Sequence, residues 1–443
     1  MGSIRLKAGI SNEEGDSHMP RTGRRSQSWL KGALLVTAVA MLTAVFAACG
    51  GDDNDKDKSP AAGGTTAAGK TPAAGATTAT GGGGTITIKK GDKLKIGLST
   101  TLTTDNAQLG LGIQDGANLA VKEKPTVKGF TVEVDAQDDL CAGPGSVTAA
   151  NKLIADKVAA VVGPMCSGGA VAALDPYSKE NLLVISSSAT NPSVTAQGKK
   201  NFFRTAWNDA TQGAEMAKYA YTTLGKKNVV LVNDQSVYGK GLMDVFKKSF
   251  TEAGGKVASE EAVTVGEKDF SPTVTKIKGA NPDMVVFGGF IAEGAILVRQ
   301  LREAGIEAAF MGADGIADPK FIEQAGGKAE GAYVSRGPKS TDTTLFDKFS
   351  AAHKAAYGKD PAQFGEYTYD AMNIVLAAIE KVGTVDASGN LVIDKDKLIA
   401  EVRATDLKGA SGEVSFDAVG DRKVVGSINE IDIVKDGKLT RVQ

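Results

Sequence analysis

One stretch indicates the architecture of the whole chain: Val158-Ala159-Ala160-Val161-Val162, followed directly by Gly163-Pro164-Met165-Cys166-Ser167. Its first five residues are all apolar, which is typical of a strand that is buried on both faces in a parallel sheet. A helix is predicted to follow from about 168 to 180. A buried strand, a loop and a helix in this order form the repeating unit of an α/β fold.

The same alternation of strand and helix patterns continues on both sides of this stretch. Strands are predicted at 94–99, 130–134 and 182–185, with helices between them at 112–122, 146–157 (with Ser146 as its cap) and 168–180. The pattern restarts after 202–206, with strands at 228–232, 257–265, 284–287 and 308–311. Strands separated by single helices predict right-handed parallel crossovers. We therefore expect an α/β chain with two doubly wound sheets, and antiparallel edge strands at 412–416 and 424–434.

Length and charge limit the possible classes of protein. The chain has 443 residues, and the part that follows Thr85 exceeds the usual size of one domain, which favours two lobes. The formal net charge is −1 and no basic stripe is present, which argues against a nucleic-acid partner.

The sequence offers little for catalysis. Of the two histidines, His18 lies near the N-terminus, and His353 is predicted on a solvated helix face rather than as a ligand or a general base. No nucleophile and base occur together at the predicted strand ends, so we do not expect an enzyme. The sequence Gly110-Leu-Gly112 lacks the third glycine of a dinucleotide-binding loop. We expect no cofactor and no metal.

The N-terminal segment 1–48 resembles an export signal that ends at Cys49. Basic residues precede an apolar stretch from about 33 to 48, and Ala47-Ala48 stand directly before Cys49. This order is that of a secretory signal, and the small residues before the cysteine resemble the lipobox of bacterial lipoproteins, in which the cysteine is acylated. An uncleaved membrane helix is the alternative. Met19 as the initiator and a twin-arginine signal at Arg24-Arg25 both stay open.

The segment 49–84 has the composition of a flexible tether. Asp52, Asp53, Asp55 and Asp57 are followed by a run of Ala, Gly and Thr, which cannot bury a core. A flexible chain of roughly 35 residues reaches roughly 30 Å. Such a tether suits a lipid anchor at Cys49. The other two cysteines, Cys141 and Cys166, are an even pair in an oxidising compartment, where a disulfide is the default expectation.

Polar and aromatic residues follow the predicted strands where a ligand would bind. In open α/β sheets, ligands lie beyond the carboxyl ends of the strands. The loops there hold hydroxyls before a helix start, which favour an anion such as a carboxylate, and one acid suited to a cation. The residues concerned are Ser167, Ser188, Thr190, Tyr238, Phe290 and Asp314. Taken singly, the serines and Asp314 are also explained as turn residues, and Tyr238 as a packing residue.

A colinear series of motifs resembles the leucine/isoleucine/valine-binding proteins, which are type I periplasmic binding proteins that serve ABC importers. The motifs extend from about Lys93 to near the C-terminus. They are Asp138-Asp139 before Cys141, Gly163-Pro-Met-Cys166-Ser167, Ser188-Ala-Thr190-Asn-Pro192, Tyr238-Gly-Lys-Gly241, Gly266-Glu-Lys-Asp-Phe-Ser271, Gly288-Gly-Phe290 and Phe310-Met-Gly-Ala-Asp314-Gly315.

The resemblance implies a role for each candidate residue. Ser167 and Thr190 would hold a ligand carboxylate, and the Ser188 carbonyl and the Asp314 carboxylate would take an ammonium group. Tyr238 would close over the ligand from the second lobe. The resemblance also implies that Phe290 and Tyr369 line the pocket and that Cys141 and Cys166 are paired.

Two positions depart from the family pattern. Leu109 stands where relatives carry an aromatic side chain that covers the ligand, and Asp314 stands where the branched-chain binders carry a longer glutamate. Both departures change the expected fit around the ligand's side chain and ammonium group.

The resemblance also implies domain organisation and function. The first lobe would comprise 93–208 and 338–423, and the second 209–337 and 424–443, with the ligand in the cleft between them. We expect an extracytoplasmic lipoprotein of an ABC importer, anchored at the outer face of the bacterial cytoplasmic membrane or in the periplasm. It would capture an amino acid, branched-chain or otherwise aliphatic, by hinge closure and deliver it to the membrane permease. The alternatives are a small amide, urea-like compound or aromatic acid as ligand, or a ligand sensor of the same fold.

Overall fold

The computed structural model describes residues 84–338, 342–423 and 429–442, all of which belong to one compact unit. The predicted leader 1–48, Cys49 and all of the tether except Gly84 lie outside these residues, as does the segment 424–428. Within the described part, no helix combines the length and the apolar composition that crossing a membrane requires.

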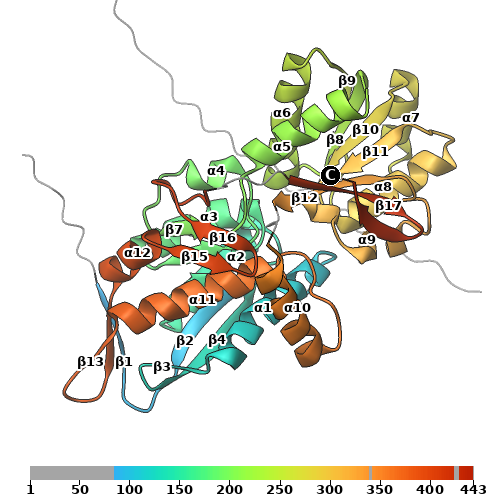
Figure 1. Ribbon diagram of the computed structural model, residues 1–443. Helices are drawn as coiled ribbons and strands as arrows, with labels where there is room; N and C mark the ends of the chain where they lie inside the picture. Colours follow the sequence, from blue (N-terminus) through green and yellow to red (C-terminus); the bar gives the residue numbers. More distant parts are fainter. Residues whose placement is uncertain (1–83, 339–341, 424–428, 443) are drawn as a thin grey trace, which may run out of the picture. The chain divides into compact units, whose positions relative to one another are not determined.

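The first lobe is built on a six-stranded sheet with the order β3-β4-β2-β5-β6-β7 (Figure 1). All of its pairings are parallel except that of β3 with β4. The strands are β2 (Leu94–Thr100), β3 (Thr126–Val127), β4 (Phe130–Asp138), β5 (Val161–Val162), β6 (Val184–Ser186) and β7 (Phe202–Arg204).

Helices from two separate parts of the sequence pack around this sheet (Figure 1). They are α1 (Ala107–Glu123), α2 (Gly143–Ala155), α3 (Ser167–Lys179), α4 (Pro192–Thr195), α10 (Thr344–Tyr357), α11 (Gly365–Val382) and α12 (Lys395–Arg403). The later helices α10 and α11 both pack on α1. Helix α2 begins at Gly143 rather than at the predicted cap Ser146, because Pro144 fits the first turn, where no backbone donor is needed.

The second lobe is built on a seven-stranded sheet with the order β18-β17-β12-β11-β10-β8-β9 (Figure 1). Five neighbouring strands pair in parallel, in the order β9, β8, β10, β11 and β12, while β17 and β18 add antiparallel pairings at one side. The strands are β8 (Asn228–Asn233), β9 (Lys256–Ala262), β10 (Met284–Gly288), β11 (Ala309–Gly312), β12 (Tyr333–Pro338), β17 (Asn429–Lys435) and β18 (Lys438–Arg441).

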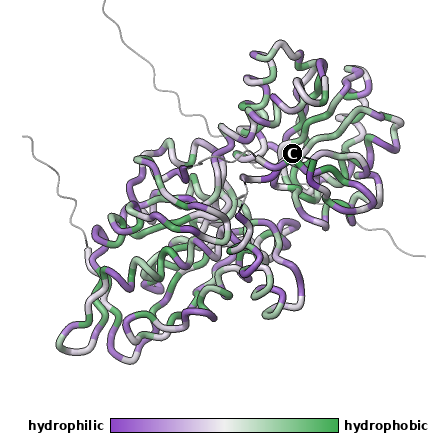
Figure 2. Tube along the Cα trace, viewed as in Figure 1, coloured by the Kyte–Doolittle hydropathy of each residue, from purple (hydrophilic) through white to green (hydrophobic). Residues whose placement is uncertain are grey.

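The helices of this lobe come from the middle of the chain. They are α5 (Asp209–Lys218), which continues as a π-helical turn η1 (Tyr219–Thr223), α6 (Val237–Glu252), α7 (Ser271–Ala280), α8 (Ile291–Glu303), the 3-10 turn η2 (Asp314–Ile316) and α9 (Pro319–Gln324). Apolar residues concentrate along the central strands, as Figure 2 shows, and the side chains of 284–287 in β10 are fully buried. Burial of such runs is the main favourable term in folding.

Two smaller sheets complete the described fold. Strand β1 (Thr85–Ile88) pairs with β14 (Leu391–Asp394), which also pairs with β13 (Thr384–Val385). Strand β16 (Gly412–Ser415) forms a hairpin with β15 (Asp406–Gly409). The predicted edge strand at 412–416 is therefore not part of either main sheet. Nor is β17 an edge, since it lies between β12 and β18.

The prediction of a solvent-exposed His353 was wrong. Its side chain is fully buried, its Nδ1 lies 3.1 Å from the Lys359 carbonyl oxygen, and its Nε2 lies 3.8 Å from Asp115 Oδ2. Phe349 and Tyr357, four residues away on either side, contact the ring. The sequence pattern gave no sign of this burial, because it arises where α10 packs on α1.

Candidate ligand-binding site

A small cavity brings together side chains that follow the parallel strands of both sheets. It is lined by Leu109, Met165, Cys166, Ser167, Ser188, Tyr238, Phe290, Asp314, Gly315 and Phe364. In the first sheet the strand order changes direction between β2 and β5, and in the second sheet it does so between β8 and β10. Ligands of open α/β sheets bind beyond the strand ends at such a point. Six of the eight predicted ligand residues therefore line one cavity.

The cavity is small in this conformation. The space that a water molecule can occupy inside it is about 10 Å³, which is about the room that one water needs. Any larger ligand therefore requires the walls to move apart.

Ser167 and Ser188 form the wall that comes from the first lobe. Ser167 is the first residue of α3, and its Oγ accepts a hydrogen bond of 3.2 Å from the Asn191 backbone N–H. Ser188 Oγ donates to the Met165 carbonyl oxygen over 2.8 Å. The N-terminus of α3 thus faces the cavity with a hydroxyl beside it, an arrangement that favours an anion.

A disulfide fixes the start of α3. Cys141 and Cys166 are bridged, with their Cα atoms 5.1 Å apart, which confirms the expected pairing. Since Cys166 is the residue directly before Ser167, the bridge ties the anion-favouring wall to the loop that follows β4. Gly110 allows α1 to lie close to the residue that follows β2, because a Cβ at this position would lie 1.7 Å from the Thr101 carbonyl oxygen.

Tyr238 and Asp314 form the wall that comes from the second lobe. Tyr238 Oη donates to Asp314 Oδ1 over 2.8 Å and accepts from the Gly315 N–H over 3.1 Å. The Tyr238 ring also lies against Phe290, with 5.3 Å between the ring centroids. Burial raises the pKa of Asp314 to about 6, although hydrogen bonds from Tyr238 and Gln212 oppose the shift. Burial and the nearby Asp314 carboxylate raise the pKa of Tyr238 well above its usual value.

Thr190 lies behind the first wall rather than in it. Its side chain is fully buried, and its Oγ1 has no hydrogen-bond partner among the described residues. Its carbonyl oxygen accepts from the Asp209 N–H over 3.0 Å. The Thr190 hydroxyl lies near the Asp209 carboxyl and opposes the rise in its pKa.

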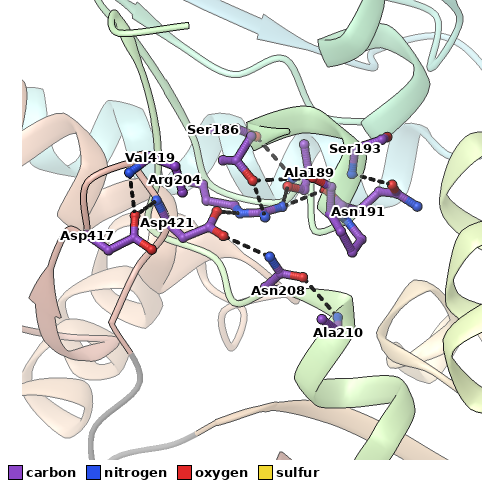
Figure 3. A network of polar contacts seen from close by, with 12 residues as sticks. Ser186, Ala189, Asn191, Ser193, Arg204, Asn208, Ala210, Asp417, Val419 and Asp421 are labelled. Carbon is purple, nitrogen blue, oxygen red and sulfur yellow. Dashed lines mark hydrogen bonds and ion pairs between the residues drawn. The ribbon is translucent and has the colours of Figure 1, made fainter. Parts of the chain in front are cut away.

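Arg204 holds the loop that carries Ser188 and Thr190 in place (Figure 3). Its guanidinium donates to the carbonyl oxygens of Ala189 and Asn191 over 2.8 and 2.9 Å, and it forms an ion pair with Asp421 over 2.7 Å. Asp421 also accepts from the side chain of Asn208, which caps α5. This buried network links the loop to the start of the second lobe's first helix.

Tyr369 is not brought to this cavity. Its hydroxyl contacts Glu123, and it lines a different pocket on the first lobe together with Phe349 and Leu345. Phe364 lines the ligand cavity instead. It stands directly before α11 with φ +70°, and the sequence analysis did not predict it.

Sequence reasoning also missed Asp209, the first residue of α5. Its side chain is fully buried close to Asp314, and its pKa is raised well above the usual value, first by burial and then by the charge of Asp314. An acid directly after Asn208 looks like an ordinary helix start, where acids are common. Only the three-dimensional structure shows that this second carboxylate is buried.

Hydrogen bonds and ion pairs between the lobes lie near the cavity. Asn191 Nδ2 donates to the Val237 carbonyl oxygen over 2.8 Å. At the surface, Lys268 Nζ lies 3.1 Å from Asp105 Oδ2. A wider pocket lies beside the cavity and shares Phe290 with it, and the acids Asp105, Asp234 and Glu293 are in its lining.

Comparisons with known proteins agree with this architecture. A family model described as periplasmic binding protein matches residues 93–437. A Leu/Ile/Val-binding protein homolog of Brucella melitensis is 32% identical over 356 residues, which cover 79% of this chain and 94% of that protein. A leucine-, isoleucine-, valine-, threonine-, and alanine-binding protein of Pseudomonas aeruginosa is 33% identical, covering 75% of this chain and 88% of that protein.

Solved structures show the same fold. The crystal structure of a leucine-binding protein from Thermotoga maritima superposes with a TM-score of 0.72 at 31% identity, covering 79% of this chain and 98% of that one. By the extent of the family match and by these relatives, the chain belongs to the periplasmic binding protein family, whose members bind solutes and are not enzymes.

Proposed function

We propose that this protein is the substrate-binding lipoprotein of an ABC importer and that its ligand is a branched-chain or other aliphatic amino acid. The observation that carries the proposal is the pairing of two opposite walls in one cavity. The N-terminus of α3 with Ser167 favours a carboxylate, and the buried Asp314 carboxylate favours a cation. Free amino acids carry both groups.

The lining between the two walls suits an aliphatic side chain. Leu109, Met165, Phe290 and Phe364 supply apolar surface, and of these Leu109 is fully buried. Burying a leucine-sized side chain contributes about 1.5–3 kcal/mol. The relatives named above, and a branched-chain amino-acid binding protein of Streptococcus pneumoniae solved in complex with isoleucine (27% identity, TM-score 0.70), support the same ligand class.

Binding would proceed by hinge motion between the lobes 93–208 plus 338–423 and 209–337 plus 424–443. The small volume of the cavity supports this, because a ligand larger than a water molecule fits only when the walls move apart. Where 337 leads to 338, Gly337 leaves room for the Trp207 ring, to which a Cβ would come within 2.0 Å. We assign Ser167, Ser188, Thr190 and Asp314 to the ligand's charged groups, and Tyr238 to closure.

A thermal-shift screen tests the ligand class. The protein is unfolded to remove bound ligand, refolded, and heated with leucine, isoleucine, valine, phenylalanine, a short aliphatic amide, urea and benzoate. A ligand at 100 times its dissociation constant should add about 2.7 kcal/mol of stability. We expect the aliphatic amino acids to raise the melting temperature most. A shift with urea, the amide or benzoate alone would assign the protein to one of the other ligand classes.

A further inference from the structure

Asn191 connects the two lobes although it is not among the residues that line the ligand cavity. It is buried in the loop after β6, directly before α4. Its Nδ2 donates to the carbonyl oxygen of Val237, the first residue of α6, over 2.8 Å. Since Tyr238 is the next residue, this hydrogen bond holds the start of the helix that carries Tyr238 against the first lobe.

The other polar groups of Asn191 fix its position in the first lobe. Its Oδ1 accepts from the Ser193 N–H over 2.9 Å and thereby caps α4, and its carbonyl oxygen accepts from Arg204 over 2.9 Å (Figure 3). Its backbone N–H donates to Ser167 Oγ over 3.2 Å. The orientation of the amide follows from its partners, because a backbone N–H can only donate and the Val237 carbonyl can only accept. The Asn191 side chain therefore reaches the second lobe from a rigid support.

The second lobe leaves room for this amide. Gly241 lies one turn after Val237 on α6, and a Cβ at this position would lie 2.0 Å from Asn191 Nδ2. Helices α3 and α6 contact each other, and a Cβ at Gly168 in the first turn of α3 would lie 3.4 Å from Val237 Cγ2. Asn191 bonds to the first residue of each helix, Ser167 of α3 and Val237 of α6. One residue thus ties the wall proposed for the carboxylate to the helix proposed for closure.

We propose that Asn191 is a latch that holds the lobes together, with or without a ligand, and that it sets how long a captured ligand stays. The part that concerns the ligand rests on the proposed function. The ion pair between Lys268 and Asp105 is a weaker link, because its side chains are 63% and 59% exposed and such pairs contribute little. Asn191 is a positioning residue, since it acts through the helix that carries Tyr238 and not by touching the ligand.

Two substitutions, one in each lobe, should break the latch and preserve the fold. Asn191→Asp keeps the oxygen that accepts from Ser193 and caps α4, but it turns a carboxylate oxygen, which has no proton to donate, toward the Val237 carbonyl oxygen. Gly241→Ala places a methyl group against the Asn191 amide, while alanine favours a helix more than glycine does. The control is Asn151→Asp, which makes the same chemical change at an exposed position of α2.

The first measurement needs no ligand. Small-angle X-ray scattering of the ligand-stripped protein should give a larger radius of gyration for Asn191→Asp and Gly241→Ala than for the wild type and Asn151→Asp. Circular dichroism checks that each variant is folded. If one latch variant does not fold, the other, which alters the opposite lobe, serves the same comparison. The same radius of gyration in the wild type and the folded latch variants would overturn the proposal.

The second measurement is the rate at which bound leucine dissociates, followed by stopped-flow displacement. Both latch variants should release leucine about 3- to 10-fold faster than the wild type and Asn151→Asp, the range that one hydrogen bond accounts for. The association rate constant should not fall. Slower association with unchanged release would mean that the substitutions damage the cavity walls, and it would also overturn the proposal. If leucine does not bind to the wild type, the amino-acid assignment fails, while the scattering comparison still decides whether Asn191 holds the lobes together.

Discussion

Asp314 combines complete burial with a position in the ligand cavity. Its Oδ1 accepts from Tyr238, and no cationic side chain is among the residues that line the cavity with it. A carboxylate in this setting suits the ammonium group of a ligand. Tyr238 orients the carboxylate and remains neutral, so the charge that would recognise an ammonium group resides on Asp314.

Replacing Asp314 by alanine should weaken leucine binding about 10- to 100-fold. The loss of a charged partner for the ammonium group costs about 1–3 kcal/mol, and each 1.4 kcal/mol is a factor of ten. Calorimetric titration measures the effect. Asp244→Ala, which removes an exposed acid on α6, is the matched control and should bind as the wild type does. Equal affinities for all three proteins would remove Asp314 from the binding site.

The pH dependence of stability provides a second prediction at this scale. The pKa of Asp314 is about 6 in the folded protein and about 3.9 in the unfolded chain. The folded state therefore favours the protonated form, and the stability this contributes is present below pH 4 and lost as the pH rises through 6.

Asp314→Asn cannot ionise, so it should gain stability relative to the ligand-free wild type between pH 4 and pH 7. The expected gain is on the order of 2–3 kcal/mol, from a shift of about two pKa units. Urea unfolding of both proteins at several pH values measures it. A stability difference that does not change with pH would show that Asp314 titrates normally.

At the scale of the elements, the start of α3 is the part of the site with the most support. The disulfide holds Cys166, Ser167 Oγ accepts from the loop after β6, and Arg204 fixes that loop from behind. Three independent interactions thus position the wall that is proposed to receive the carboxylate. Preorganisation of this kind reduces the entropy that binding would otherwise cost.

Removing the disulfide should therefore affect both stability and binding. The double variant Cys141→Ser, Cys166→Ser should lose about 3–4 kcal/mol of unfolding free energy, as the chain-entropy model gives for a loop of this length. Its affinity for leucine should also fall, because Ser167 is no longer held. Denaturant unfolding and calorimetry measure the two effects. An unfolding free energy equal to that of the wild type would show that packing alone fixes the loop.

The element pattern was largely predictable from the sequence, because apolar runs such as 284–287 are buried and form strands. The boundaries of the elements were less predictable from the sequence. Strand β5 comprises only Val161–Val162 of the predicted 158–162, and β4 extends to Asp138 rather than ending at 134. The residues that form the cavity walls follow strand ends, so the sequence pattern could predict most of them. The burial of Asp209, Phe364 and His353 was not predicted, since it depends on contacts between segments far apart in the sequence.

We expect the protein to be held at a membrane surface by its N-terminus. Mature protein isolated from its native host should begin with an acylated Cys49, and mass spectrometry of the N-terminal peptide should show the added lipid. The Cys49→Ser variant should be released from the membrane fraction. An intact leader on the native protein, or a Cys49→Ser variant that stays membrane-bound, would refute lipid anchoring.

The cavity is proposed to select a molecule with both an ammonium and a carboxylate group. Calorimetric titration of ligand-stripped protein with leucine and with a short aliphatic amide, each against wild type and Asp314→Asn, tests it most directly. We predict that the wild type binds leucine with one-to-one stoichiometry and that Asp314→Asn binds it more weakly. Binding of the amide alone, with an affinity that Asp314→Asn leaves unchanged, would show that the cavity does not select an amino acid.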